Sequence, residues 1–328
     1  MRKFTFFALF LCFATTIFAQ QVLSNRFAMR LIENEDGSFE LRDRARLAAL
    51  VDLDAIPDLL VPYVHQRTKI SGNDYRHIRT QEFVFKTDGY YELTLAVDFA
   101  ESDVPTPFMI YLHGGGWQRG TKNANRSLSR YTAAKGGITG VRISYTLSGR
   151  ENSNAKHSIQ DVLDALKWVQ EHAEKLNVNP NLFGFYGNSA GAHLAAMAAL
   201  KTPGTSVLIG TVGIYDLQTS RITIRATDPE RIRYFAYLDP QFLYEISPIN
   251  HISPDNLPAT FLIHGTADII VEVGQSKRLA EKLKSKGAQA VRLDIHPNYD
   301  HNITSSTSDL QEVIFLDAFQ FMVDNLTK

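Results

Sequence analysis

From about residue 81 onward, short apolar runs alternate with stretches in which apolar residues recur every three or four positions. Short runs rich in β-branched and aromatic residues predict strands, and the longer period predicts amphipathic helices. Strands are expected over 82–86, 91–100, 107–113, 137–145, 182–187, 206–216, 258–265 and 290–296. Helices are expected over 155–176, 189–200, 276–286 and 310–326. Alternation of the two predicts an α/β fold with a mostly parallel central sheet and helices on both faces.

The remaining segments break this rhythm and define the expected organisation. Residues 1–19 join two basic residues to an apolar run ending at Ala19, the layout of a signal peptide. Residues 20–80 form an N-terminal extension in which 41–51 predicts a short amphipathic helix. Residues 81–328 form one α/β domain, and 217–256, rich in Arg, Tyr and Phe, predict a small cap insertion between two strands.

Composition and charge narrow the possible functions. The chain has 44% hydrophobic and 21% charged residues and a formal net charge of −1, without a basic run, so nucleic acid is not an expected partner. The single cysteine, Cys12, lies within the predicted signal peptide. Cleavage near Ala19 would therefore leave an exported protein, periplasmic or secreted, with no membrane anchor in the mature chain. Such a protein cannot use cysteine as a nucleophile or as a zinc ligand.

A candidate nucleophile lies at a predicted strand-to-helix turn. Gly187-Asn188-Ser189-Ala190-Gly191 follows an apolar strand and opens a helix rich in small residues. In such a sharp turn the two glycines leave room for the backbone, and the serine projects above the sheet. The alternative is a Gly/Ser-rich turn without chemistry.

A second motif follows another predicted buried strand. His113-Gly114-Gly115-Gly116-Trp117 contains three consecutive glycines, whose bare N–H groups can converge on a negatively charged oxygen. His113 is expected to fix this loop by bonding to the backbone rather than to act in catalysis.

Together the two motifs resemble the α/β-hydrolase superfamily. The similarity is to its hormone-sensitive-lipase-like and carboxylesterase branch, including exported acetyl and feruloyl esterases of carbohydrate degradation (BD-FAE-like), and it covers roughly residues 80–325. The resemblance implies an α/β-hydrolase fold and an oxyanion hole formed by the N–H groups of Gly115, Gly116 and Ala190. Trp117 and Asn188, which belong to these motifs, are expected to contact the substrate.

The chain order in such folds is serine, acid, histidine. Asp268 follows the strand predicted over 258–265 and matches the acid position, with Asp216 as the alternative one strand earlier. His301 lies beyond the last predicted strand and is the expected base, whereas His296 still lies at the strand's end. Asp300 precedes His301 where the family usually has glycine.

The expected function is that of an exported serine carboxylesterase acting by a Ser189–His301–Asp268 acyl-enzyme mechanism. The expected substrates are short-chain acyl or feruloyl esters, small or linked to carbohydrate, and neither a cofactor nor a metal is expected. Two alternatives remain: an amidase or peptidase of the same fold, and a hydrolase-like binding protein without turnover.

Overall fold

The computed structural model describes residues 31–33, 39–41, 75–88, 91–224, 226–303 and 309–327. The predicted signal peptide lies outside the described residues, as does most of the N-terminal extension. Within that extension a short antiparallel pair, β1 (Leu31–Glu33) and β2 (Phe39–Leu41), is present that the sequence pattern did not predict. Leu41, expected to begin a helix, ends β2, and the rest of that predicted helix is not described.

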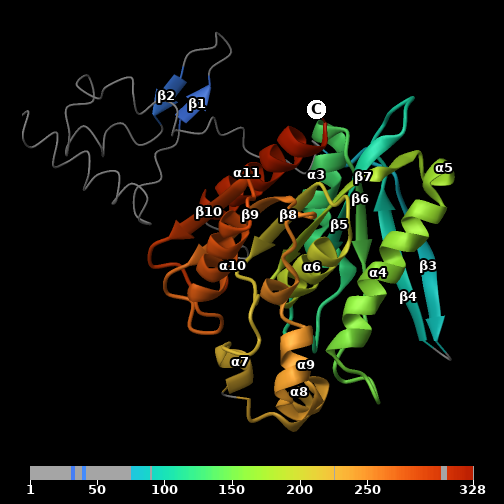
Figure 1. Cartoon of the computed structure of the whole chain (residues 1–328). Coiled ribbons are helices and arrows are strands. Elements are labelled where there is room, and N and C mark those ends of the chain that lie inside the picture. The colour runs from blue at the N-terminus through green and yellow to red at the C-terminus, as the bar shows by residue number, and fades with distance from the viewer. Residues whose placement is uncertain are drawn as a thin grey trace, which may run out of the picture.

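The main sheet has eight strands in the order β10-β9-β8-β7-β5-β6-β4-β3 (Figure 1). Its strands are β3 (Thr80–Asp88), β4 (Tyr91–Asp98), β5 (Thr106–Leu112), β6 (Thr139–Ile143), β7 (Val178–Asn188), β8 (Val207–Thr211), β9 (Ala259–Gly265) and β10 (Val291–His296). Strands β5 to β10 pair in parallel, while β3 and β4 pair antiparallel and β4 joins β6 antiparallel. The predicted mostly parallel α/β architecture is confirmed.

Strand β8 is shorter than predicted, ending at Thr211 instead of continuing to Asp216. Its pairing with β7 ends at the Asn188–Thr211 pair, where β7 itself ends. Val212 then adopts a φ of 46° and turns the chain out of the sheet. The apolar residues that follow, including Ile214 and Tyr215, are buried in the core without belonging to a strand.

Helices cover both faces of the sheet (Figure 1). They are α3 (Arg126–Gly136), α4 (Ala155–Glu171), α5 (Ala173–Leu176), α6 (Ala190–Lys201), α10 (Gly274–Ser285) and α11 (Asp309–Leu326). Side chains of α4, α6 and α10 share one buried cluster, and side chains of α3 and α11 share the other. The helix expected over 155–176 is divided at His172, where φ of −107° and ψ of 17° interrupt the helical geometry.

The segment between β8 and β9 consists of short helices. These are α7 (Arg221–Ile224), α8 (Pro229–Tyr234), η5 (Ala236–Leu238), α9 (Pro240–Glu245) and η6 (Pro248–His251). Gln118, which follows β5, donates a 2.6 Å hydrogen bond from Nε2 to Asp228 Oδ2, so this segment lies against the loop at the carboxyl end of β5. Among the described residues, no helix has the length and apolar character needed to cross a membrane.

Candidate active site

Ser189 lies at the sharp turn between β7 and α6. Its backbone has φ of 52° and ψ of −121°, a conformation that residues with a side chain rarely adopt. A Cβ at Gly187 would lie 2.2 Å from the carbonyl oxygen of Gly191, and a Cβ at Gly191 would lie 2.4 Å from that of Leu112. Both glycines of the motif are therefore required by close approach of the backbone, and the turn holds Ser189 in its strained conformation.

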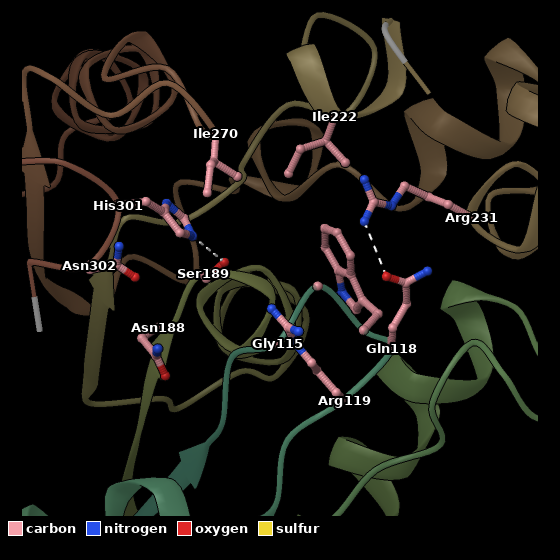
Figure 2. Close-up of a pocket in the computed structure, with 12 residues that line it drawn as sticks. Gly115, Gln118, Arg119, Asn188, Ser189, Ile222, Arg231, Ile270, His301 and Asn302 are labelled. Atoms are coloured by element: carbon pink, nitrogen blue, oxygen red, sulfur yellow. Dashed lines mark hydrogen bonds between the residues drawn. The ribbon is translucent and has the colours of Figure 1, made fainter. Parts of the chain in front are cut away.

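The structure brings the three residues of the predicted triad into one hydrogen-bonded chain. Ser189 Oγ lies 2.8 Å from His301 Nε2 (Figure 2). His301 Nδ1 lies 2.7 Å from Asp268 Oδ2. Because the carboxylate can only accept, Nδ1 carries the proton and Nε2 is left as the acceptor for the serine hydroxyl. This is the protonation pattern that a histidine base requires.

Asp268 is buried and fully hydrogen-bonded. Its Oδ1 accepts the N–H groups of Ile270 (2.9 Å) and Val271 (2.8 Å), and His264 Nε2 lies 3.2 Å from Oδ2. Burial by itself raises the pKa of Asp268, but the hydrogen bonds from His264 and His301 outweigh it and hold the pKa well below the ordinary aspartate value. The carboxylate therefore stays ionised across the physiological range.

His264 is a site residue that the sequence analysis did not identify. It is buried at the end of β9, its Nδ1 accepts from Ser276 Oγ (2.8 Å), and its Nε2 is shared between Asp268 and the carbonyl of Val271 (3.0 Å). The signal was available, because His264 precedes Asp268 by four residues at the carboxyl end of a buried strand.

Backbone hydrogen bonds join the loop that carries Asp268 to the loop that carries His301. The N–H of Ala267 donates to the Tyr299 carbonyl (2.9 Å), and the N–H of Thr266 donates to the His296 carbonyl (3.0 Å). A Cβ at Gly265 would lie 2.1 Å from that Tyr299 oxygen, so glycine permits this contact.

Asp300, which departs from the family pattern, has a local structural role. Its Oδ1 accepts the N–H of Asn302 at 2.8 Å, so the carboxylate closes a turn around His301. An aspartate here supplies by side-chain bonding the tight turn for which glycine would supply backbone freedom.

The alternative acid and base lie elsewhere. Asp216 accepts hydrogen bonds from the N–H of Gln218 (3.2 Å) and from Thr219 Oγ1 (2.5 Å) within its own turn. His296 ends β10 and packs its ring against Tyr299, and burial lowers the pKa of His296. The structure brings Asp268 and His301 to Ser189, and it brings neither alternative there.

The glycine loop after β5 faces the same space. Gly115 and Gly116 have φ of 113° and 63°, and Trp117 has φ of 60°. Among the described residues, the N–H groups of Gly115 and Gly116 have no hydrogen-bond acceptor. Ala190 is the first residue of α6, where a helix N–H lacks an intrahelical partner. The three predicted oxyanion-hole amides are thus available, and their role stays a prediction.

Five side chains fix this loop. Asn188 Oδ1 accepts the Gly114 N–H (3.1 Å), and His113 Nδ1 donates to the Gly114 carbonyl (2.7 Å) while its ring stacks on Tyr145. Trp117 Nε1 donates to His193 Nδ1 (3.2 Å). His113 therefore has the structural role expected of it. Asn188 Oδ1 and Trp117 Nε1 are engaged within the protein, and substrate contact by either residue stays a prediction.

A cavity of about 460 Å³ opens over these residues. Its walls include six predicted residues: Gly115, Gly116, Trp117, Asn188, Ser189 and His301. Six further residues were not predicted as site residues: Gln118, Arg119, Ile222, Arg231, Ile270 and Asn302 (Figure 2). Most of these come from the short helices and loops beyond the sheet, whose placement no periodic pattern encodes. Within the described part of the chain, no group of three or more His, Cys, Asp or Glu side chains is arranged to hold a metal ion.

The fold and site geometry are those of an α/β-hydrolase with a serine at the sharp turn between strand and helix. Thermogutta terrifontis esterase 2 with butyrate bound superposes with a TM-score of 0.63 at 23% identity, over 76% of this chain and 95% of that one. The BD-FAE family model matches residues 98–283. The chain therefore belongs to the BD-FAE family.

Two curated relatives, both from Mycobacterium tuberculosis, carry names that describe activity on esters. Esterase LipC is 28% identical over 253 residues, covering 68% of this chain and 56% of LipC. The probable carboxylic ester hydrolase LipM is 30% identical over 204 residues, covering 56% of this chain and 46% of LipM. The chain thus spans about half the length of these relatives.

Proposed function

We propose that this protein is a serine carboxylesterase that hydrolyses carboxylic esters through an acyl-enzyme. The observation that carries the proposal is the hydrogen-bonded chain from Ser189 Oγ through His301 to Asp268, at 2.8 and 2.7 Å. Membership of the BD-FAE family and the esterase names of its relatives support ester hydrolysis as the reaction.

The geometry supports a specific sequence of steps. His301 Nε2 takes the Ser189 hydroxyl proton as Oγ attacks the ester carbonyl, and Asp268 stabilises the resulting imidazolium. The amides of Gly115, Gly116 and Ala190 stabilise the oxyanion. The imidazolium then gives its proton to the leaving alcohol, and water, activated by the same histidine, cleaves the acyl-enzyme to acid and free serine.

We propose in addition that the acyl group is short or feruloyl, that the alcohol belongs to a small molecule or a carbohydrate, and that the protein is exported. The apolar side chains of Ile222 and Ile270 in the cavity wall support an apolar acyl group. Export rests on the signal-like pattern of residues 1–19, and N-terminal sequencing of protein recovered outside the cytoplasm, beginning near Gln20, would test it.

Substituting the proposed nucleophile and base tests the mechanism. Ser189→Ala and His301→Ala are each expected to lower kcat on p-nitrophenyl acetate by about 10³-fold or more, because each removes a group that acts on the reacting atoms. His296→Ala is the matched histidine control and should retain activity within a few-fold. Loss of activity in His296→Ala with retention in His301→Ala would overturn the assignment of the base.

Matched esters and amides test the reaction class. Acetyl, butyryl and feruloyl esters are expected to be hydrolysed faster than the corresponding anilides, as measured by kcat/KM. Faster hydrolysis of the anilides would favour the amidase alternative. If an organophosphate labels Ser189 but the protein hydrolyses none of these substrates, esterase activity on them is contradicted.

A further inference from the structure

The two arginines of α8 differ in how their guanidinium groups are used. Arg233 donates to the carbonyl oxygens of Ser153 (3.1 Å), Ser148 (2.5 Å) and Arg150 (3.4 Å), so it fastens the short helix to a neighbouring loop. Arg231 lines the cavity instead (Figure 2). Its Nη2 donates one long hydrogen bond of 3.3 Å to Gln118 Oε1.

Arg231 has hydrogen-bonding capacity that the described part of the protein does not use. Its Nε is buried from water and has no acceptor there. A guanidinium carries five donors and keeps its charge at every accessible pH. Because Nε is buried, a ligand in the cavity would reach the guanidinium through its Nη atoms, and Nη2 makes only the one long hydrogen bond to Gln118.

The charge around the cavity is unbalanced. Arg231 and Arg119 line it, and no aspartate or glutamate of the described part of the chain does. Among the described residues, neither arginine has a carboxylate within ion-pair distance. Asp228, whose carboxylate accepts a hydrogen bond from Gln118 Nε2, does not line the cavity. The cavity therefore presents an uncompensated positive charge to whatever enters it.

Arg231 also lies next to the glycine loop. A Cβ built on Gly116 would find a single neighbour, Arg231 Nη2 at 3.7 Å. Figure 2 shows Ser189 and His301 toward one side of the cavity and Arg231 and Gln118 toward the other. An ester held at Ser189 can therefore extend over Gly116 and bring a second functional group to the guanidinium.

We infer that Arg231 is a specificity-determining residue that binds a carboxylate carried by the ester substrate, away from the ester group itself. The inference rests on the proposed esterase function. A carboxylate is the group whose two oxygens match the planar guanidinium fork. It can come from the acyl side, as in the half-ester of a dicarboxylic acid, or from the alcohol side, as in an esterified uronic or hydroxybenzoic acid.

Charge-matched ester pairs test the inference and distinguish the two sources. The acyl-side pair is mono-p-nitrophenyl adipate, which keeps a free carboxylate, and methyl p-nitrophenyl adipate, in which that carboxylate is methylated. The alcohol-side pair is 4-acetoxybenzoate and its methyl ester. For at least one pair, wild-type kcat/KM is expected to favour the charged member by about tenfold or more. Arg231→Gln should reduce that charged-to-neutral ratio about tenfold, and Arg231→Lys should retain part of it.

Arg126→Gln is the matched control, because it removes an exposed positive charge that does not line the cavity. It should leave the ratio unchanged. The wild-type ratio should also fall as salt is raised from about 0.01 to 1 M, a measurement that depends on no variant. A neutral preference in both pairs, or an unchanged ratio in a folded Arg231→Gln, would overturn the inference. If the wild-type protein hydrolyses none of the four esters, the proposed esterase function, on which this inference rests, is overturned instead.

Discussion

Asp268 has more hydrogen-bond donors than the orientation of one histidine requires. Two backbone N–H groups occupy Oδ1, while His301 and His264 converge on Oδ2. The backbone donors fix the carboxylate plane, and the second histidine holds Oδ2 at the place where His301 must find it. The acid is thus positioned from three directions before any substrate binds.

Replacing this acid should reduce activity strongly. Asp268→Asn is expected to lower kcat by about 10²- to 10⁴-fold, because an amide in place of the carboxylate can hold His301 in the wrong tautomer and cannot stabilise the imidazolium. Asp216→Asn is the control, since Asp216 is bonded within its own turn, and it should stay within about twofold of wild type. The measurement is steady-state hydrolysis of p-nitrophenyl acetate. The reverse order of effects would assign the acid to Asp216.

His193 should make the fold sensitive to mild acid. It is fully buried, and burial lowers its pKa from 6.5 to about 4 although it donates to the Ile246 carbonyl. Between these pH values the unfolded chain binds a proton that the folded chain does not, so this histidine's contribution to the unfolding free energy declines as pH falls from 6.5 toward 4. The slope is at most about 1.4 kcal/mol per pH unit.

His193→Gln tests this dependence, because a glutamine amide can still accept from Trp117 and donate to Ile246 but does not titrate. Urea unfolding at pH 7 and pH 5 should show a smaller loss of stability in His193→Gln than in wild type. His77→Gln, which removes an exposed histidine, should behave as wild type does. Equal losses in wild type and His193→Gln would mean that His193 does not account for the acid sensitivity.

At the scale of elements, residues that recur in a pattern were predictable and contacts between distant loops were not. The strand, serine turn and small-residue helix around Ser189 follow from local sequence, although the crowding that requires Gly191 comes from the Leu112 carbonyl on a distant strand. The hydrogen bonds from Thr266 and Ala267 to the loop before His301 join segments far apart in sequence. The periodicity of neither segment encodes these hydrogen bonds. The role of Asp300 in closing the turn could therefore not be predicted from the sequence.

The short helices between β8 and β9 show the same limit. Their aromatic and arginine content indicated an insertion, but which side chains reach the cavity depends on how α7 and α8 pack. Arg231 and Arg233 are two positions apart and would be indistinguishable in sequence. In the structure one lines the cavity and the other binds loop carbonyls.

For the whole molecule, the antiparallel side of the sheet is joined to the parallel side around a buried ion pair. Arg142 on β6 and Asp98 on β4 are bonded at 2.7 Å, and both side chains are almost completely buried. Asp98 also accepts hydrogen bonds from Thr80 Oγ1 and Ser129 Oγ, so β3 and α3 converge on the same carboxylate. The apolar pattern predicted these elements, but not the charged pair on which four of them meet.

Breaking this pair from one side should destabilise the protein. Arg142→Met is expected to lower the unfolding free energy by about 3–5 kcal/mol, because it leaves Asp98 buried and uncompensated. The double variant Arg142→Met/Asp98→Asn should recover part of that loss, since no uncompensated charge remains. Urea denaturation of the single and double variants measures both effects. A single-variant cost below about 1 kcal/mol would show that water reaches Asp98.

Two of the side chains that hold the glycine loop come from the turn that carries the nucleophile and from the helix after it. Asn188 precedes Ser189, and His193 lies on α6. In directed evolution, a library that randomises only residues 113–119 would lose most of its variants, because the altered loop no longer fits the side chains that hold it. These variants would be inactive even if their loop suited a new substrate. Recombining those positions with 188 and 193 searches combinations in which the loop and its anchors change together. In this protein the glycine loop and the serine turn must therefore be varied together. Substrate range can be varied more freely through Ile222, Arg231 and Ile270, which line the cavity.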